Sequence, residues 1–191
     1  MSNPIRVDLS GRRALVTGGA KGIGEAISLA LARCGANIAV HNRTSGTRAE
    51  ELVQQFRKDG LQAVAVEADI AKPDECVRMI QQAREGLGGP IDILVNNAGG
   101  PLTSSAIAEM PLELWREVLA DMKEQGWGRI INISSISGRS GGGPGGSPYA
   151  AAKAAVNSLT KSLAKEGGEH GVTANAVSPG VILTEIHQKQ T

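Results

Sequence analysis

Short apolar runs alternate with longer amphipathic segments along the chain, and this alternation restricts the possible folds more than any other feature. We expect six strands, at 13–17, 37–41, 62–67, 91–95, 129–133 and 172–177. Five helices are expected between them, at 22–34, 46–59, 73–86, 111–125 and 148–166. Near-continuous apolar runs, as in the first and fourth strands, are typical of parallel strands that are covered on both faces. The pattern therefore predicts an α/β fold with a Rossmann-type, doubly wound parallel sheet in a single domain, 1–191.

The composition excludes several classes of partner. Lys and Arg total 20 against 19 Asp and Glu, so the chain lacks the concentrated positive charge that nucleic acids or membrane surfaces attract. Aromatic residues make up only 2% of the chain, too few for a base-stacking surface. Because the sequence shows neither a secretory signal nor a long apolar run, we expect a cytoplasmic protein. The two cysteines and three histidines match no metal-ligand spacing, so no metal is expected, and they are interpreted as ordinary residues.

A glycine-rich turn, T-G-G-A-K-G-I-G, joins the first predicted strand to the first helix at residues 17–24. Gly18 allows the chain to turn sharply, Gly22 lets a pyrophosphate approach the backbone, and Gly24 permits close packing of the helix. The start of the following helix also presents free N–H groups to an anion. Taken alone, the motif is also compatible with a purely structural turn.

The spacing T-G-x-x-x-G-x-G resembles the short-chain dehydrogenase/reductase family. Three further motifs fit the same family in the same order, namely N-N-A-G at 96–99, Y-A-A-A-K at 149–153 and P-G at 179–180. The resemblance covers residues 9 to about 184 and is strongest with members of the 3-oxoacyl-[acyl-carrier-protein] reductase type. It implies an oxidoreductase that transfers hydride between a nicotinamide and a carbonyl or secondary alcohol on a small-molecule substrate.

Tyr149 and Lys153 are four residues apart in the last predicted helix, so their side chains lie on one face. A free tyrosine titrates at about pH 10, and a neighbouring ammonium favours its charged form, which suits proton exchange. The alternative is a tyrosine that only packs beside a solvated lysine. A serine hydroxyl at the end of the fifth strand can bind a substrate oxygen, and the resemblance selects Ser135, with Ser134 or Ser137 as lesser candidates. By the same resemblance, Tyr149 passes the proton and Ser135 polarises the substrate oxygen. Lys153 adjusts the acidity of Tyr149 and holds the ribose hydroxyls.

The expected cofactor is NADP(H) in preference to NAD(H). An acidic residue at the end of the second strand would select NAD, but the chain has His41, Asn42 and Arg43 there. Arg43 and Lys21 can instead pair with a 2′-phosphate, although either residue alone is compatible with an ordinary surface charge. The residues expected to bind the cofactor, several of them by resemblance only, are Gly18, Lys21, Gly22, Ile23, Gly24, Asn42, Arg43, Asp69, Ile70, Asn97, Ala98, Gly99, Tyr149, Lys153, Pro179, Gly180, Ile182 and Thr184.

The sequence departs from the family pattern in two places. The crossover between the fourth and fifth strands is roughly fifteen residues shorter than the usual layout of this doubly wound fold, so no fourth catalytic residue is assigned. The segments that match a seventh strand and a substrate lid are not visible, and we expect the sixth strand to form an exposed apolar edge. A homo-oligomer, dimer or tetramer, is expected if the family's interface helices are present. The alternative function is a non-catalytic or impaired dinucleotide-binding protein that has lost the lid and proton-relay segments.

Overall fold

Six parallel strands form one sheet in the computed structural model, which describes residues 7–44, 46–99 and 112–182. The strand order is β3-β2-β1-β4-β5-β6. The strands are β1 (Arg13–Val16), β2 (Asn37–Asn42), β3 (Ala63–Glu67), β4 (Ile93–Asn96), β5 (Gly128–Ile133) and β6 (Val172–Val177). The helices are α1 (Gly22–Arg33), α2 (Thr47–Lys58), α3 (Pro73–Leu87), α4 (Leu112–Glu124), α5 (Ser137–Ser140) and α6 (Ser147–Gly167), followed by the 3₁₀ turn η1 (Gly168–His170). The predicted doubly wound sheet is confirmed.

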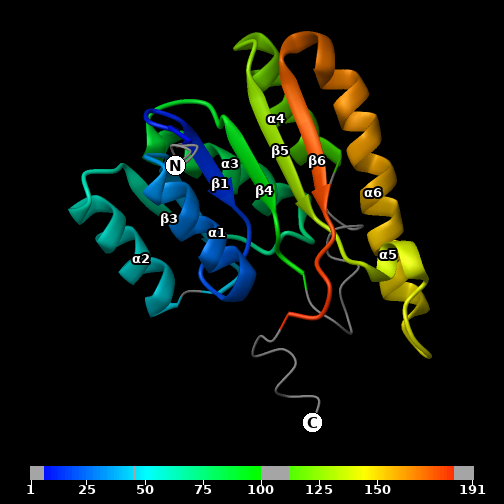
Figure 1. The fold of residues 1–191 in the computed structure, drawn as a ribbon. Helices are drawn as coiled ribbons and strands as arrows, with labels where there is room; N and C mark the ends of the chain where they lie inside the picture. The colour runs from blue at the N-terminus through cyan, green and yellow to red at the C-terminus, as the bar shows by residue number, and fades with distance from the viewer. Residues whose placement is uncertain (1–6, 45, 100–111, 183–191) are drawn as a thin grey trace, which may run out of the picture.

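Helices cover the sheet on two sides (Figure 1). On one side α1 and α2 enclose a cluster that includes Phe56, Ile38 and Val40. On the other side α3, α4 and α6 enclose a second cluster, in which Trp115 is the largest fully buried side chain. Strands β1, β2 and β4 contribute to both clusters, which explains their uninterrupted apolar sequences. None of the helices in the described ranges combines the length and apolar character needed to traverse a bilayer.

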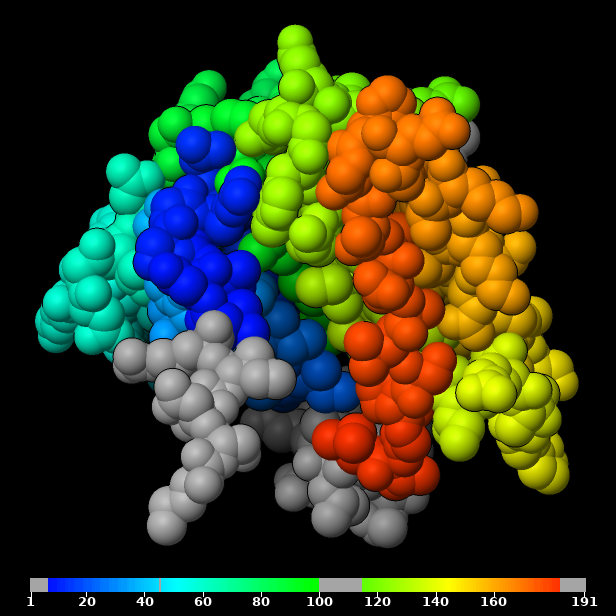
Figure 2. All heavy atoms as spheres, turned by 45° about the horizontal axis from the view of Figure 1, so that its top comes forward, coloured from blue at the N-terminus to red at the C-terminus, as the bar shows by residue number. Residues whose placement is uncertain are grey.

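The sixth strand ends the described sheet and is less apolar than expected on its exposed side. Thr173 and Asn175 are polar and exposed, whereas Val172 and Ala174 are buried against α6. Val177 is the one large apolar side chain of the strand that is exposed. Figure 2 shows β6 running along the surface of the viewed face. The expectation of an apolar edge is therefore only partly right, because polar residues alternate with the buried ones.

The glycine-rich segment at 138–146 begins as a short helix. Residues 137–140 form α5, and Gly141, with φ of 84°, ends it. A Cβ built on Gly138 would lie 2.7 Å from the carbonyl carbon of Lys153, so the missing side chain lets α5 pack closely against α6. Loop composition alone does not predict this turn, because the stabilising contact comes from a helix farther along the chain.

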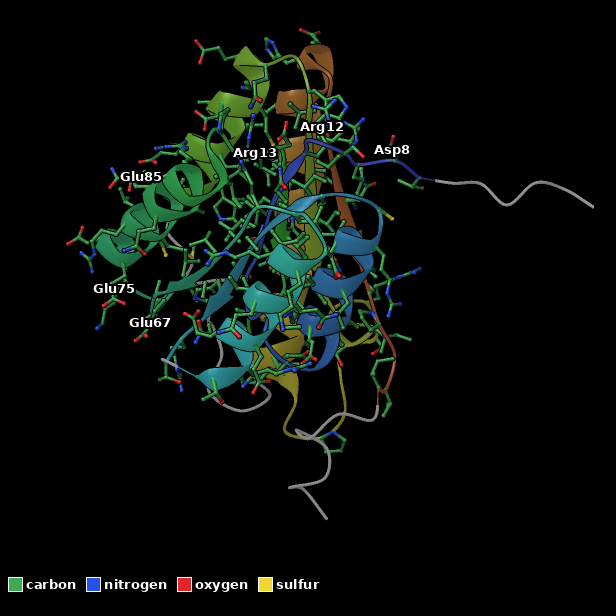
Figure 3. The ribbon with its side chains drawn as sticks, turned by 90° about the vertical axis from the view of Figure 1, so that its left-hand side faces the viewer. Asp8, Arg12, Arg13, Glu67, Glu75 and Glu85 are labelled. Atoms are coloured by element: carbon green, nitrogen blue, oxygen red, sulfur yellow. The ribbon has the colours of Figure 1, made fainter. Side chains whose placement is uncertain are left out.

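The amino ends of the strands are held by an ionic cluster. The buried carboxylate of Asp92 lies 3.2 Å from a guanidinium nitrogen of Arg12 and 3.4 Å from one of Arg13. Arg12 also stacks on the Trp127 ring, at 3.7 Å from its centroid, and Arg129 contacts the same ring at 4.3 Å. Figure 3 shows Arg12 and Arg13 at the end of the molecule opposite to the turn between β1 and α1. This cluster stabilises the sheet at a distance from the candidate site.

Candidate active site

The predicted glycine turn joins β1 to α1 as a tightly packed corner. Gly18 and Gly22 have positive φ angles of 63° and 53°, a conformation that other residues adopt with difficulty. A Cβ on Gly24 would lie 2.2 Å from the Gly18 carbonyl oxygen and 2.5 Å from Nδ2 of Asn97. Gly24 therefore lets α1 pack closely against the turn and against Asn97.

The first turn of α1 lacks a side-chain cap. Lys21 occupies the N-cap position in an extended conformation, and its side chain makes no capping hydrogen bond. The free N–H groups at a helix start carry partial positive charge and can bind an anion. Ile23 lies in this first turn and is half-buried. The local geometry fits a phosphate group at the place where the sequence predicted one.

Thr17 and Asn97 connect the end of β1 to the end of β4. The Thr17 hydroxyl oxygen accepts hydrogen bonds from the backbone N–H of Asn97 at 2.9 Å and of Ala98 at 3.0 Å. The Asn97 side chain donates to the Thr17 carbonyl at 2.9 Å. On the helix side, the buried Ser28 hydroxyl lies 3.0 Å from the Gly24 carbonyl. Neither Thr17 nor Ser28 was predicted as a site residue, although each is a polar residue within an apolar run.

His41 is a further residue that sequence reasoning did not assign to the site. It is buried near the end of β2, and its Nδ1 accepts a hydrogen bond from the Gly18 N–H at 3.0 Å. Since Nδ1 accepts, Nε2 carries the hydrogen and donates to the Ala68 carbonyl at 2.9 Å. Burial lowers the pKa of His41 below its usual value, in keeping with a neutral ring. The ring thus joins the glycine turn to the end of β3.

The residues expected at the adenosine end lie at the ends of β2 and β3. Asn42 is the last residue of β2, Arg43 follows it in an exposed position, and Lys21 is exposed on the neighbouring turn. Among the ion pairs of the described residues, none involves Lys21 or Arg43. One carboxylate lies nearby, because Glu67 is the register partner of Asn42, and Figure 3 shows its side chain at the surface.

The loop after β3 contains Asp69 and Ile70. The Asp69 carboxylate accepts from the backbone N–H of Ala71 at 3.1 Å, and its own N–H donates to Glu75 at 2.6 Å. Ile70 is largely buried in the core that α3 covers. The loop is therefore held by its own polar groups beside the start of α3.

The three predicted catalytic residues come from β5 and α6. Ser135 follows β5, and its hydroxyl oxygen accepts from the Ser137 N–H at 3.2 Å. The alternative candidate Ser134 is buried and donates to the Lys153 carbonyl at 3.1 Å, so its hydroxyl already has a structural partner. Ser137 is the first residue of α5. Ser135 is the second residue after β5 and is partly exposed, whereas Ser134 is buried and Ser137 lies in α5.

Tyr149 and Lys153 lie on successive turns of α6. The Lys153 ammonium lies 5.8 Å from the centre of the Tyr149 ring and donates to the Ile133 carbonyl at 2.8 Å. Burial lowers the pKa of Lys153 to about 8, because the charged form loses water that one carbonyl does not replace. Lys153 therefore links the tyrosine to the end of β5, the strand that Ser135 follows.

A chain of buried hydrogen bonds connects β4 and β5 to α6. Asn96 donates to Asn132 at 2.9 Å, Asn132 donates to Thr160 at 2.8 Å, and Thr160 donates to the Val156 carbonyl at 2.7 Å. Two apolar residues of α6, Ala152 and Leu159, are only half-buried. Two polar residues, Lys153 and Thr160, are buried: the Thr160 hydroxyl makes both of its bonds in this chain, and the Lys153 ammonium donates one bond, to the Ile133 carbonyl.

The structure brings the predicted residues to one edge of the sheet. Because all strands are parallel, their carboxyl ends meet at the lower edge in Figure 1. The set includes Asn97, Ala98 and Gly99 after β4, and Pro179, Gly180 and Ile182 after β6. The Pro179 carbonyl accepts from Ile136 at 3.0 Å, which ties the chain after β6 to the residue that follows Ser135. Thr184 lies outside the described residues.

Comparisons with known proteins identify the family. The family model described as short chain dehydrogenase matches residues 12–191. The chain is 39% identical to a 3-oxoacyl-[acyl-carrier-protein] reductase of Synechocystis, with 93% of this chain and 77% of the relative covered. It is also 39% identical to a D-beta-hydroxybutyrate dehydrogenase of Cupriavidus necator, with 95% and 75% covered.

Solved structures agree with this assignment. A putative short-chain alcohol dehydrogenase from Sinorhizobium meliloti superposes with a TM-score of 0.82 at 35% identity, covering 94% of this chain and 75% of that one. A short chain dehydrogenase from Burkholderia cenocepacia, solved in complex with NADP, has a TM-score of 0.77 at 35% identity, with 95% and 78% covered. With the fold, the motif order and the family match in agreement, the chain belongs to the short-chain dehydrogenase family.

Proposed function

We propose that the protein is an NADP-dependent oxidoreductase that interconverts a carbonyl and a secondary alcohol through Tyr149, Lys153 and Ser135. The observation that carries this proposal is the placement of the Lys153 ammonium 5.8 Å from the Tyr149 ring, beside the strand that Ser135 follows. A tyrosine, a buried lysine and a serine at one strand end can together exchange a proton with a substrate oxygen.

The residues around the glycine turn fit a dinucleotide. The uncapped start of α1, with Gly18 and Gly22 beside it, would hold the pyrophosphate. The loops after β3, β4 and β6 would hold the adenine, ribose and nicotinamide ends, through residues such as Asp69, Asn97 and Pro179. When bound there, the nicotinamide supplies the hydride-transfer chemistry.

The side chains of this protein would move and stabilise the proton. The Tyr149 hydroxyl would give its proton to the substrate oxygen in reduction and take it back in oxidation. At pH values below about 8 Lys153 is protonated, and its charge beside the ring stabilises the tyrosinate that remains. The Ser135 hydroxyl would donate a hydrogen bond to the same substrate oxygen as negative charge develops on it.

The preference for NADP(H) rests on Lys21 and Arg43. Both are exposed at the adenosine end and, among the described residues, have no carboxylate partner, so both are available to a 2′-phosphate. The similar structure from Burkholderia cenocepacia was solved with NADP, which supports the same choice. Replacing both residues with alanine should weaken NADPH binding about tenfold or more while leaving NADH binding nearly unchanged. Lys58→Ala, an exposed lysine on α2, is the matched control.

The substrate proposed is a 3-oxoacyl or 3-hydroxyacyl compound. The names of both relatives, a 3-oxoacyl reductase and a 3-hydroxybutyrate-type dehydrogenase, describe an oxygen on the third carbon of an acyl chain. Because the two names share this chemistry, an acetoacetyl thioester is the first substrate to test, with a simple diketone beside it.

Two variants test the proposed roles. Tyr149→Phe should lower turnover of the acetoacetyl thioester by about a hundredfold or more and leave NADPH affinity nearly unchanged, since it removes only the proton donor. Ser135→Ala should also lower turnover, whereas Ser158→Ala, an exposed serine on α6, should not. NADPH binding by the wild type without turnover of any carbonyl substrate would contradict the proposal.

A further inference from the structure

The His41 ring joins two loops that are expected at the cofactor. Strand β2 lies between β1 and β3 in the sheet, so a side chain near its end reaches both neighbours. Nδ1 accepts from Gly18 in the turn after β1, and Nε2 donates to Ala68 in the loop after β3. The ring is 2% exposed, so water does not replace either bond.

The two bonds of the ring differ from the backbone bonds beside them. Backbone groups of His41 and Asn42 already bind Gly19 and Ala68, and these bonds only continue the pairing of the strands. The Gly18 N–H, in contrast, has the His41 ring as its partner among the described residues. The ring therefore fixes the orientation of the peptide bond between Thr17 and Gly18, and Gly18 is a residue of the turn with positive φ.

That orientation matters because the other side of the turn is crowded. The Thr17 carbonyl, which shares a peptide with the Gly18 N–H, accepts from the Asn97 side chain at 2.9 Å. The next carbonyl, that of Gly18, accepts from Asn97 at 3.3 Å and lies 2.2 Å from where a Cβ on Gly24 would be. A rotation of the peptide between Thr17 and Gly18 therefore disturbs the loop after β4 directly, and the start of α1 through the adjoining Gly18 carbonyl. Any ligand bound by the backbone of this turn depends on the ring that holds it.

We propose that His41 is a positioning residue for the dinucleotide: its neutral ring, oriented by the Ala68 carbonyl, holds the Gly18 N–H and so fixes the glycine turn. The inference rests on the proposed function, because it concerns the affinity of the same cofactor site. His41 does not touch the reacting atoms, so it acts on binding and not on the chemical step.

Substitutions that each preserve one of the two hydrogen bonds of the ring test this role. In His41→Asn, the side-chain oxygen occupies the position of Nδ1 and can accept from Gly18, but the bond to Ala68 is lost. In His41→Gln, the amide nitrogen reaches the position of Nε2 and can donate to Ala68, but the Gly18 N–H loses its acceptor. His41→Leu removes both bonds, and His170→Leu, at an exposed position in η1, is the matched control.

We expect NADPH and NADH to bind His41→Gln and His41→Leu about tenfold more weakly than the wild type, by the same factor for both dinucleotides. His41→Asn should stay within about threefold of the wild type, and kcat at saturating NADPH should change little in all folded variants. Equal affinity in the wild type and in folded His41→Gln would overturn the inference, as would a loss in His41→Asn as large as that in His41→Gln.

A measurement on the wild type keeps the test independent of variant folding. Nitrogen NMR of the imidazole should show His41 neutral with its hydrogen on Nε2, and the opposite tautomer would overturn the inference. If the wild type binds neither NADPH nor NADH, the proposed function itself fails. If the wild type binds a dinucleotide and the His41 variants bind it equally well, only the inference about His41 fails.

Discussion

Replacing Lys153 with methionine should make the protein more stable at neutral pH while removing its activity. The lysine is 8% exposed, and its ammonium has one hydrogen-bond partner, the Ile133 carbonyl. Methionine has a similar length and no charge, so it removes the cost of burying the ammonium. Replacing a site residue is expected to raise stability where that residue carries a buried charge that lowers the free energy of unfolding.

The magnitude follows from the pKa of Lys153, which burial lowers from 10.5 to about 8. At pH 7 the lysine is protonated in both the folded and unfolded states, and the lowered pKa corresponds to a cost of about 3 kcal/mol. Loss of the hydrogen bond to Ile133 offsets about 1 kcal/mol of this in the variant. Lys153→Met should therefore be more stable than the wild type by about 2 kcal/mol at pH 7.

The sign of the pH dependence distinguishes this account from a simple packing effect. Between about pH 8 and pH 10.5 the folded wild type loses the Lys153 proton before the unfolded chain does, so its free energy of unfolding rises. By pH 10 the advantage of Lys153→Met should be close to zero. Burial also raises the pKa of Cys76 to about 11, which lowers stability above pH 9, but both proteins share this effect and it cancels.

Urea unfolding at pH 7 and pH 10, followed by circular dichroism, measures the difference between variant and wild type at each pH. Lys161→Met, an exposed position on α6, is the control and should differ from the wild type equally at both. An advantage of Lys153→Met that is the same at pH 7 and pH 10, or no advantage at pH 7, would refute the reasoning.

Three further substitutions test the packing that supports the site and the sheet. Gly24→Ala should weaken NADPH binding, measured by fluorescence, about tenfold or more, because its Cβ would lie 2.2 Å from the Gly18 carbonyl oxygen. Gly168→Ala is the control: its Cβ would have no atom within 4 Å, so NADPH binding should not change. Asn132→Ala should lower the free energy of unfolding by about 2 kcal/mol, since it removes two buried hydrogen bonds, and a loss below about 0.5 kcal/mol in urea unfolding would contradict this. Asp92→Ala should lower the free energy of unfolding by about 2 kcal/mol in the same assay. This loss is smaller than for a fully buried ion pair, because the two arginine side chains are partly exposed to water. An unchanged free energy of unfolding would show that the cluster does not stabilise the sheet.

The fold could be predicted from the sequence because its main signal is local and repeated. Each strand is a short apolar run that precedes a longer amphipathic segment, and this order leads directly to a doubly wound sheet. The ends of elements were predicted to within two residues in most cases, as with β6 at Val172–Val177 and α1 at Gly22–Arg33. The position of the candidate site followed as well, because parallel strands bring their carboxyl ends together.

The contacts within the site could not be predicted in the same way. His41, Thr17 and Ser28 each bind backbone groups of a different element, and these partners are adjacent only after the sheet has formed. A histidine at the end of a strand has no local signature that separates such a role from ordinary packing. The same applies to Lys153, whose bond to the Ile133 carbonyl depends on how α6 lies against β5.

We propose that this chain uses Tyr149 as the proton donor in the reduction of a carbonyl by NADPH. The most direct measurement is the rate of NADPH oxidation with an acetoacetyl thioester, for the wild type and Tyr149→Phe at NADPH concentrations that saturate both. We expect turnover by the wild type and a loss of about a hundredfold or more in Tyr149→Phe, with NADPH bound equally well by both. Equal rates in the two proteins, or a wild type that binds NADPH and reduces no carbonyl substrate, would contradict it.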